Sequence, residues 1–266
     1  MKDSLVIINK IIIRLRESMR RRVGQTIKSG QCICVICGCK SPYFLPYFAG
    51  SALAPVNIML NVVGSDLKRY ACPKCGSNDR ERHLKLYFEH SKLRSMLKGA
   101  RILHFAPERC FGAYVLDAEP LEHVKADLFP KSSDVKKIDM LKIDFPEMYF
   151  DVVIANHVLE HVANDRLALS EICRVLKPGG VAILQTPFSD MLQSTFEDPG
   201  IATKVAREFA YGQDDHVRLY GRDIFSRISA TGLTSRVRLH QEVLGHLDVK
   251  AYGVNPREPF FLFERT

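Results

Sequence analysis

The order of apolar and polar positions in the second half of the chain predicts strands that alternate with helices. Residues 150–155 form a short, nearly continuous apolar run, which is typical of a strand buried on both faces. Apolar residues then recur at the i, i+3, i+4, i+7 spacing of a helix from Leu169 to Leu176. The Pro-Gly-Gly turn at 178–180 ends this helix, and residues 181–184 form another buried strand. A strand, a helix and a strand in this order predict a right-handed βαβ unit of a parallel sheet.

Similar patterns place further elements on both sides of this unit. We expect a strand with its following loop at residues 101–108, additional strands at 124–126, 135–138, 233–239 and 260–264, and a helix at 222–232. The connection at 188–221 is long for a compact domain, and connections of this length usually carry function. The elements together predict an α/β fold.

Residues 3–22 are predicted to form one basic amphipathic helix. Leu5, Ile12 and Met19 share a face with other apolar residues, and a run of arginines at 20–22 closes the helix. Such a helix either lies on a membrane surface or packs against protein, and the sequence leaves both alternatives open. We take residues 1–30 as the first segment of the chain.

Composition sets limits on the class of protein. The chain has 266 residues, of which 46% are hydrophobic and 26% charged, as in a soluble globular protein with room for one α/β domain and a smaller module. No run of 18 apolar residues predicts a membrane span. The net charge of +8 is uneven, because the first 100 residues are basic and the remainder is mildly acidic. This favours an anionic contact for the N-terminal part and makes nucleic acid a less favoured partner for the remainder.

Two Cys-x-x-Cys-Gly motifs predict a metal site. Cys34 with Cys37 and Cys72 with Cys75 supply four thiolates, which is the donor set of a closed structural Zn²⁺ site. Cys32 and Cys39 lie close enough in sequence to replace a neighbour, and their part stays open. The spacer at 38–71 is expected to form a hairpin or loop without a helix. Paired thiols of this kind indicate a reducing compartment, and we expect a cytoplasmic protein that is either free or peripheral to the membrane.

Several motifs resemble one family. The segments His-Val-Leu-Glu-His-Val at 157–162 and Arg-Val-Leu-Lys-Pro-Gly-Gly at 174–180 are similar to class I S-adenosylmethionine (SAM) dependent methyltransferases of type 11. Leu-His-Phe-Ala-Pro-Glu at 103–108 and Asp-His-Val-Arg-Leu-Tyr-Gly at 215–221 resemble a subgroup with an N-terminal Cys₄ zinc-knuckle module.

The resemblance implies a fold and a division of the chain. The fold is a Rossmann-like seven-stranded methyltransferase sheet with an antiparallel last strand, preceded by an N-terminal helix and a small zinc-binding module. The zinc-knuckle module and a linker helix would occupy residues 31–99, and the methyltransferase domain residues 100–266.

The resemblance also implies a SAM site along the strand ends. In a typical member the first loop is rich in glycine, whereas here His104, Ala106 and Glu108 occupy the acidic and glycine positions. Asp127, which ends the second strand, would bind the ribose hydroxyls. Asp139 would meet the adenine amino group, with Asp144 as a competitor. The expected cofactor-binding residues are His104, Ala106, Glu108, Asp127, Asp139, Met140, Asn156 and His157.

Residues that would bind the methyl acceptor are expected in two places, just before the methyltransferase domain and in its long connection. Arg80, Arg82 and His83 would bind an anionic group, because guanidinium groups suit carboxylate and phosphate; the alternative is a salt-bridged helical turn. The long connection would roof the acceptor pocket, and either Asp215 or His216 would deprotonate a hydroxyl nucleophile; the alternative is a lid without proton transfer. Three further substrate-binding candidates lie in this connection: Glu197, Arg218 and Tyr220.

We therefore expect an enzyme that moves a methyl group from SAM to an oxygen or nitrogen of a small-molecule, sugar or lipid-linked acceptor. The basic N-terminal part supports an alternative, an RNA methyltransferase whose zinc module holds RNA. The replaced glycines of the first loop support another, a non-catalytic scaffold with a methyltransferase-like fold.

Overall fold

The structure is a computed structural model that describes residues 18–19, 22–23, 26, 29–47 and 54–266. The predicted helix at 3–22 lies almost entirely outside these residues, so its membrane or protein contact stays a prediction. Within the described part of the chain, no helix has the length and apolar character needed to cross a membrane.

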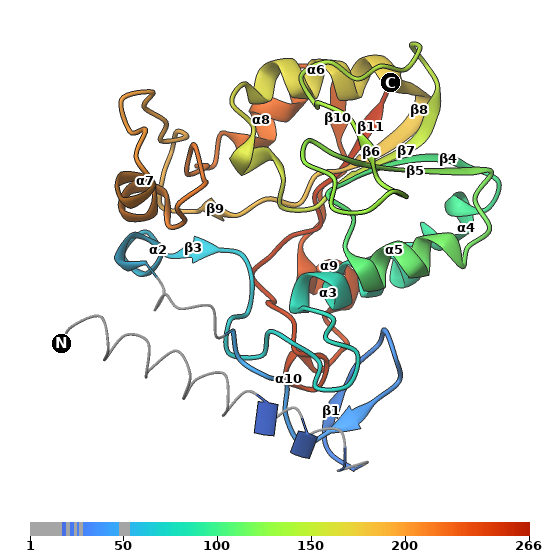
Figure 1. Ribbon diagram of the computed structural model, residues 1–266, viewed down its shortest axis with the longest axis vertical. Helices are drawn as coiled ribbons and strands as arrows, with labels where there is room; N and C mark the ends of the chain where they lie inside the picture. Colours follow the sequence, from blue (N-terminus) through green and yellow to red (C-terminus); the bar gives the residue numbers. More distant parts are fainter. Residues whose placement is uncertain (1–17, 20–21, 24–25, 27–28, 48–53) are drawn as a thin grey trace.

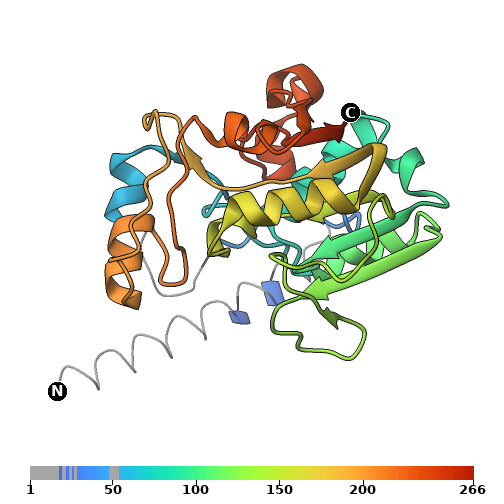
Figure 2. The ribbon, with the colours of Figure 1, turned by 90° about the horizontal axis from the view of Figure 1, so that it is seen from above.

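Seven strands form the central sheet, as predicted (Figures 1 and 2). Their order is β10-β11-β8-β7-β4-β5-β6, and β11 is antiparallel to both of its neighbours. The strands β4, β5, β6, β7 and β8, whose carboxyl ends are followed by predicted site residues, run parallel to one another. Their bounds are β4 (Arg101–Phe105), β5 (Glu122–Asp127), β6 (Lys136–Lys137), β7 (Phe150–Ala155), β8 (Leu176–Ile183), β10 (Leu233–Ser235) and β11 (Leu262–Arg265).

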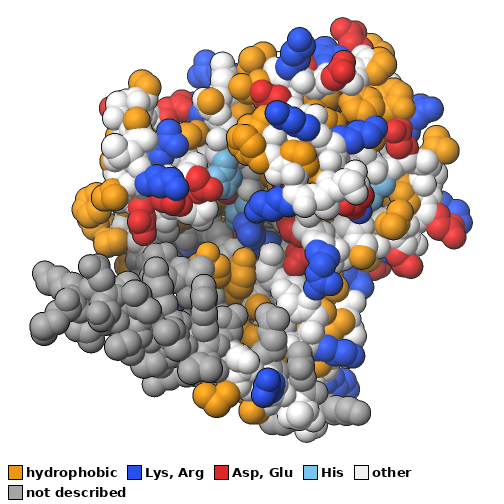
Figure 3. All heavy atoms as spheres, viewed as in Figure 1, with side chains coloured by type: hydrophobic (Ala, Val, Ile, Leu, Met, Phe, Trp, Pro, Cys, Tyr) orange, Lys and Arg blue, Asp and Glu red, His pale blue; other side chains and the backbone are white. Residues whose placement is uncertain are grey.

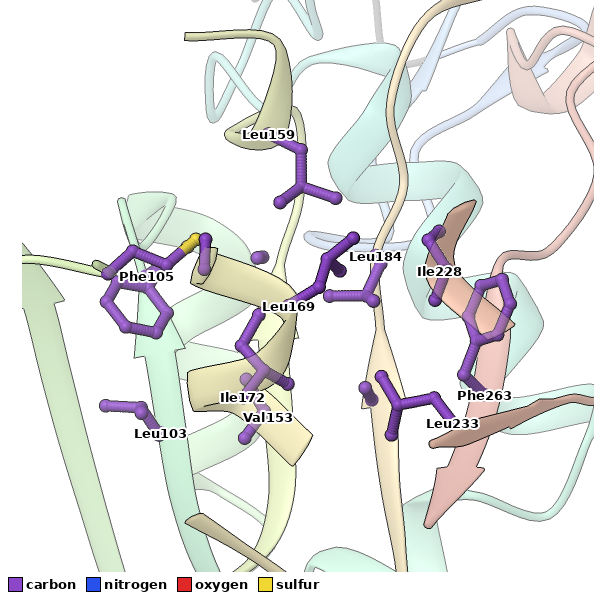
Figure 4. Close-up of a cluster of buried hydrophobic side chains, with 14 of the residues drawn as sticks. Leu103, Phe105, Val153, Leu159, Leu169, Ile172, Leu184, Ile228, Leu233 and Phe263 are labelled. Atoms are coloured by element: carbon purple, nitrogen blue, oxygen red, sulfur yellow. The ribbon is translucent and has the colours of Figure 1, made fainter. Parts of the chain in front are cut away.

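Helices cover both faces of the sheet, because its central strands are apolar on both sides. Leu103 and Val153 point to the face covered by α6 (Asp165–Val175) and α8 (Ile224–Ser229), where they join one buried cluster (Figure 4). Ile102 and Val152, each one residue earlier, point to the opposite face and join a second cluster. That cluster is closed by α3 (Asp79–His90), α4 (Arg94–Leu97), α5 (Arg109–Leu116) and α9 (His240–Leu244).

Two element boundaries differ from the prediction at the Pro-Gly-Gly segment. The helix ends at Val175, and β8 already begins at Leu176 and passes through residues 178–180. The pairing of β7 with β8 shifts register between Phe150 and Val152, and Gly179 has a φ of +76°. These residues therefore form an irregular start of the strand, where we predicted a turn before it.

The module before α3 contains short elements held together by its cysteines. They are β1 (Cys32–Ile33), β2 (Lys40–Ser41), α2 (Pro55–Met59) and β3 (Val62–Val63). The helix α2 corrects our expectation that the spacer at 38–71 lacks a helix; a proline in its first turn suits a helix start. Near the chain's other end, α10 (Val249–Tyr252) contacts β1.

The long connection after β8 closes over the module. It contains β9 (Phe188–Ser189) and α7 (Lys204–Tyr211), and this helix is capped by Thr203 and ended by Gly212 at a φ of +89°. The strand β9 pairs with β3, and α7 contacts α2 (Figure 1). The N-terminal module and the predicted roof therefore form one wall opposite the strand ends.

The helix α3 joins the module to the sheet. A capping box between Asn78 and Glu81 fixes its start. The other carboxylate oxygen of Glu81 accepts the backbone N–H groups of Cys110 (2.9 Å) and Phe111 (3.0 Å) at the start of α5. Because α3 is buried nearly all round, its apolar residues do not follow a single clear stripe in the sequence.

Candidate functional site

Four cysteines meet in the N-terminal module. The Sγ atoms of Cys34 and Cys75 lie 3.7 Å apart, and those of Cys37 and Cys72 lie 3.8 Å apart. Tetrahedral Zn²⁺ with bonds of about 2.3 Å would hold its sulfurs about 3.8 Å apart, so the spacing fits this ion. Cys32 and Cys39 face backbone carbonyls instead and do not belong to the group.

The glycines of both motifs have the conformation expected of a knuckle. Gly38 and Gly76 have φ angles of +69° and +77°. Their N–H groups donate to the carbonyls of Cys34 and Cys72, at 2.8 and 2.9 Å. This turn directs the two sulfurs of each motif to the same side.

The loop after β4 is built as a strained, hydrogen-bonded turn. Ala106 has a φ of +44°, a region that favours glycine, so it keeps the backbone shape at a glycine position of the motif. The carboxylate of Glu108 accepts from Asn156 Nδ2 at 2.5 Å and lies 3.3 Å from His104 Nε2. Burial raises the pKa of Glu108, but His104 outweighs it and the pKa is lowered. Glu108 is thus an anion at the carboxyl edge of the sheet.

The predicted ribose and adenine residues follow along the same edge. Asp127 ends β5 and accepts the N–H of Phe129 at 2.8 Å. Asp139 is exposed and accepts the N–H of Leu141 at 2.9 Å, whereas Met140 is buried in the core beside it. The structure thus brings Asp127 and Asp139 to one edge, as a nucleoside site requires.

A cavity of about 860 Å³ lies beside this edge, at the carboxyl ends of β7 and β8. The module and α7 supply its other walls, and histidine side chains show in a hollow on this face (Figure 3). Its lining includes the polar side chains of Arg80, His157, Glu160, His161 and His216. It therefore combines residues predicted separately for the cofactor, the substrate and catalysis.

A chain of buried imidazoles and carboxylates leads to the cavity. His83 lies 2.8 Å from His240 and 3.1 Å from Glu258. His157 lies 3.4 Å from Glu258 through Nε2 and 3.4 Å from Glu160 through Nδ1. Burial and Arg80 lower the pKa of His157, but Glu160 and Glu258 outweigh them and the pKa is raised. The backbone of His157 is also strained, with a φ of +55°.

Glu160 is the anion on which this part of the cavity centres. Burial raises its pKa, but His157, His161 and His216 outweigh it and lower the pKa to about 2. Its Oε2 accepts from the hydroxyl of Thr186 at 2.9 Å. Both catalytic candidates lie close by: Asp215 contacts His161 at 3.3 Å, and the His161 and His216 rings lie 4.8 Å apart.

The two arginines predicted for substrate have different surroundings. Arg80 lines the cavity, and Tyr70, Asp79, Glu108 and Glu160 raise its pKa although burial opposes them. Within the described residues its Nε has no hydrogen-bond partner.

Arg82, in contrast, is fully buried on the opposite side of α3. Its guanidinium donates to five backbone carbonyls, those of Arg69, Tyr70, Ser77, Tyr252 and Gly253. This gives Arg82 a structural role and leaves it away from the cavity lining.

The substrate candidates of the long connection also serve the framework. Arg218 is buried and bonded to Glu197 and three carbonyls. Tyr220 is buried and donates to Asp165. Glu197 bridges Arg218 and Arg227. The three side chains hold the roof onto α6 and α8, and none of them lines the cavity.

Sequence reasoning assigned Glu160 and His161 no function beyond orienting their loop, and it missed Glu258 and His240. His83, predicted with the two arginines for an anionic group, instead contacts Glu258 and His240. The spacing His-x-x-Glu-His was a visible signal for Glu160 and His161, since it places both beside a strand end. No local pattern marks Glu258, which reaches the network from a segment near the end of the chain.

Residues 99–184 match the family model Methyltransf_11, a methyltransferase domain. Over these residues the chain is similar to methyltransferase domains. The match runs from the start of β4 to just after β8 and includes the predicted cofactor edge, whereas the Cys₄ module and the roof lie outside it.

Two curated proteins share parts of the chain. One, from Mycolicibacterium smegmatis and described as a probable S-adenosylmethionine-dependent methyltransferase, is 34% identical over 71 residues, which are 27% of each chain. The other, the ubiquinone/menaquinone biosynthesis C-methyltransferase UbiE of Chromobacterium violaceum, is 46% identical over 46 residues, 17% of this chain and 19% of that protein. The chain thus spans about a quarter or less of the length of these relatives.

One solved structure matches the chain at low identity. The 1,6-didemethyltoxoflavin-N1-methyltransferase of Burkholderia thailandensis, solved with 1,6-didemethyltoxoflavin and S-adenosylhomocysteine, is 16% identical, with a TM-score of 0.45. The match covers 71% of this chain and 80% of that one.

Proposed function

We propose that this protein is a SAM-dependent methyltransferase that acts on an oxygen or nitrogen of a small-molecule, sugar or lipid-linked acceptor. The observation that carries the proposal is the position of His157. It follows the end of β7 beside Asn156 and Glu108, and its side chain also lines the 860 Å³ cavity. A cofactor on the strand-end edge and an acceptor in the cavity would therefore be neighbours.

The cofactor would lie along the carboxyl ends of β4 to β6. Asp127 would accept the ribose hydroxyls, Asp139 the adenine amino group, and Glu108 the amino group of the methionine part. The left-handed turn at Ala106 supports this placement, because it keeps the backbone shape at a glycine position of the family loop. Bound SAM supplies an electrophilic methyl group on a sulfonium.

The cavity would hold the acceptor. Its size suits a small molecule or one sugar unit of a larger acceptor. Arg80 would bind an anionic group of the acceptor, because its guanidinium lines the cavity and has a donor to spare among the described residues. The main contribution to rate would be alignment of the acceptor atom with the methyl group, and Asp215 or His216 would take a hydroxyl proton.

The Cys₄ group would hold structural Zn²⁺. Cys34, Cys37, Cys72 and Cys75 supply the sulfur donors and spacing that this ion requires. The ion would stabilise the wall that carries Arg80, and it would take no part in methyl transfer. Such free thiol pairs also favour a reducing location, the cytoplasm.

The test is calorimetric titration of the zinc-loaded chain with SAM and S-adenosylhomocysteine. We expect binding that Asp127→Ala weakens at least tenfold. Asp117→Asn is the control, because this acid follows α5 at the opposite edge of the sheet, where it binds Arg94. Absence of binding by a folded, zinc-loaded sample contradicts the proposal and favours a non-catalytic scaffold.

A further inference from the structure

Three metal-ligating side chains meet on the wall of the cavity. Glu160, His161 and His216 each offer one donor atom, and these atoms lie within 4.8 Å of one another. They come from two segments far apart in sequence, the end of the 3₁₀ turn at Leu159–His161 and the roof. The Cys₄ group contributes none of these residues.

Each of the three side chains is held by its other polar atom. His161 Nδ1 lies 3.3 Å from Asp215 Oδ2, and His216 Nδ1 lies 3.2 Å from the carbonyl oxygen of Tyr211. Glu160 Oε2 accepts the hydroxyl of Thr186. In metal sites, such hydrogen bonds fix the ring tautomer and direct the remaining nitrogen toward the ion. The same pattern here leaves Nε2 of both histidines as donors. The third donor is Oε1 of Glu160, which also lies 3.4 Å from Nδ1 of His157.

We propose that Glu160, His161 and His216 bind one divalent transition-metal ion in the acceptor cavity. Two imidazoles with one carboxylate suit ions such as Mn²⁺, Co²⁺ and Zn²⁺ better than Ca²⁺ or Mg²⁺, which prefer oxygen ligands. Three ligands also leave coordination positions open, as sites that bind a substrate require. With bonds of about 2.1 Å, two ligands can lie at most about 4.2 Å apart, so binding draws the donors slightly together.

If the protein is the methyltransferase proposed above, the ion would determine which class of acceptor it methylates. Open positions directed into the cavity fit an acceptor that presents two adjacent oxygens, such as the vicinal hydroxyls of a sugar. The ion makes the bound hydroxyl more acidic. Its oxygen then forms the bond to the SAM methyl carbon, the carbon–sulfur bond breaks with its electron pair going to sulfur, and Asp215 takes the proton. Because His216 is a metal ligand in this arrangement, Asp215 is the remaining candidate for the base.

The experiment measures Mn²⁺ binding to the full chain, which keeps zinc on the Cys₄ group after dialysis against a weak chelator has removed zinc from the three-ligand site. Electron paramagnetic resonance counts free Mn²⁺, and the thiolates of the Cys₄ group disfavour this ion. We expect one Mn²⁺ per chain, with affinity reduced at least a hundredfold in both Glu160→Gln and His216→Asn. Asp215→Asn, which removes no proposed ligand but weakens the support of His161, is expected to reduce affinity tenfold to a hundredfold. His246→Asn, an exposed histidine outside the site, is the control.

Zinc content and the urea midpoint of each variant show whether it is folded. No Mn²⁺ binding by the wild-type chain overturns the site, as does unchanged binding in both ligand variants. S-adenosylhomocysteine binding is measured separately without Mn²⁺. Mn²⁺ bound without S-adenosylhomocysteine supports the metal site while the methyltransferase proposal fails, and the reverse result overturns the metal site alone.

Discussion

Nδ1 of His83 lies 3.1 Å from Oε2 of Glu258, and both side chains are buried. His83 belongs to the helix that follows the second cysteine motif, whereas Glu258 precedes the last strand. Glu258 also faces His157, which lines the cavity. The module is therefore joined to the strand-end residues through a polar contact, and changes in one are expected to affect the other.

The first prediction concerns the Cys₄ group. Cys37→Ser is expected to reduce bound zinc from one ion per chain to nearly none, because it removes one of four ligands. Cys32→Ser and Cys39→Ser are the matched controls and should keep one ion, since neither sulfur belongs to the group. Zinc is measured by elemental analysis after dialysis against a weak chelator. Full zinc in Cys37→Ser, or its loss in either control, would contradict this assignment.

The second prediction concerns Arg82. Its replacement by methionine removes a donor from five backbone carbonyls, of which that of Ser77 keeps the N–H of Cys72. Each buried group left unsatisfied costs about 1–3 kcal/mol. We expect the free energy of unfolding to fall by at least about 3 kcal/mol in urea titrations. Arg94→Met, which removes a more exposed arginine bound to Asp117, is expected to cost less than about 1 kcal/mol. A small effect at Arg82 would show that the carbonyls find other donors.

The third prediction concerns the left-handed residue of the first loop. Ala106→Val places a β-branched side chain at a φ of +44°, and we expect a loss of about 1–2 kcal/mol in stability. It should also weaken S-adenosylhomocysteine binding, because the turn supports the proposed cofactor edge. Ala106→Gly is the control and should retain both properties. Equal behaviour of the two variants in titration and calorimetry would remove the conformational argument.

The fourth prediction concerns pH. Burial and His83 lower the pKa of His240 to about 4, although Glu258 opposes them. The unfolded chain, with a pKa near 6.5 at this residue, binds more protons between these values, so stability is lost as pH falls from about 6.5 to 4. The loss from His240 is a few kcal/mol at most, because each unit of pKa difference corresponds to about 1.4 kcal/mol.

Thermal unfolding across this pH range checks the effect, with His240→Gln as the comparison. In this variant, stability should decline less as pH falls. Part of the remaining decline comes from His123, because burial, His104 and Lys125 lower the pKa of this residue to about 4. A nuclear magnetic resonance titration of His240 with a midpoint near 6.5 would refute the assignment.

The sheet and the cysteine site could be predicted because their signals are local. Continuous apolar runs marked β4, β7 and the second half of β8, and the two Cys-x-x-Cys-Gly motifs marked the knuckles. The strand ends then placed Asp127, Asp139 and His157 on one edge. Lys136 and Lys137 form only a two-residue edge strand, since the surrounding residues have no partner strand beyond them in the sheet.

The acceptor side was less predictable, because its residues act through contacts between distant segments. Arg82, Arg218 and Tyr220 belong to residue types that bind substrates, yet their partners here are carbonyls and carboxylates of the framework. Nothing local distinguishes Arg80 from Arg82. Their difference arises because α3 turns one side toward the cavity and the other toward carbonyls of the module and of residues 252–253.

The cage around Arg82 also has a consequence for synthesis on the ribosome. Its guanidinium needs the carbonyls of Tyr252 and Gly253, which are made 170 and 171 residues later. Until those residues emerge, the helix carrying Arg82 holds a cation whose native partners are incomplete. The N-terminal module therefore reaches its final packing only after residues 252 and 253 have emerged, and chains truncated before Tyr252 should be substrates for chaperones and proteases.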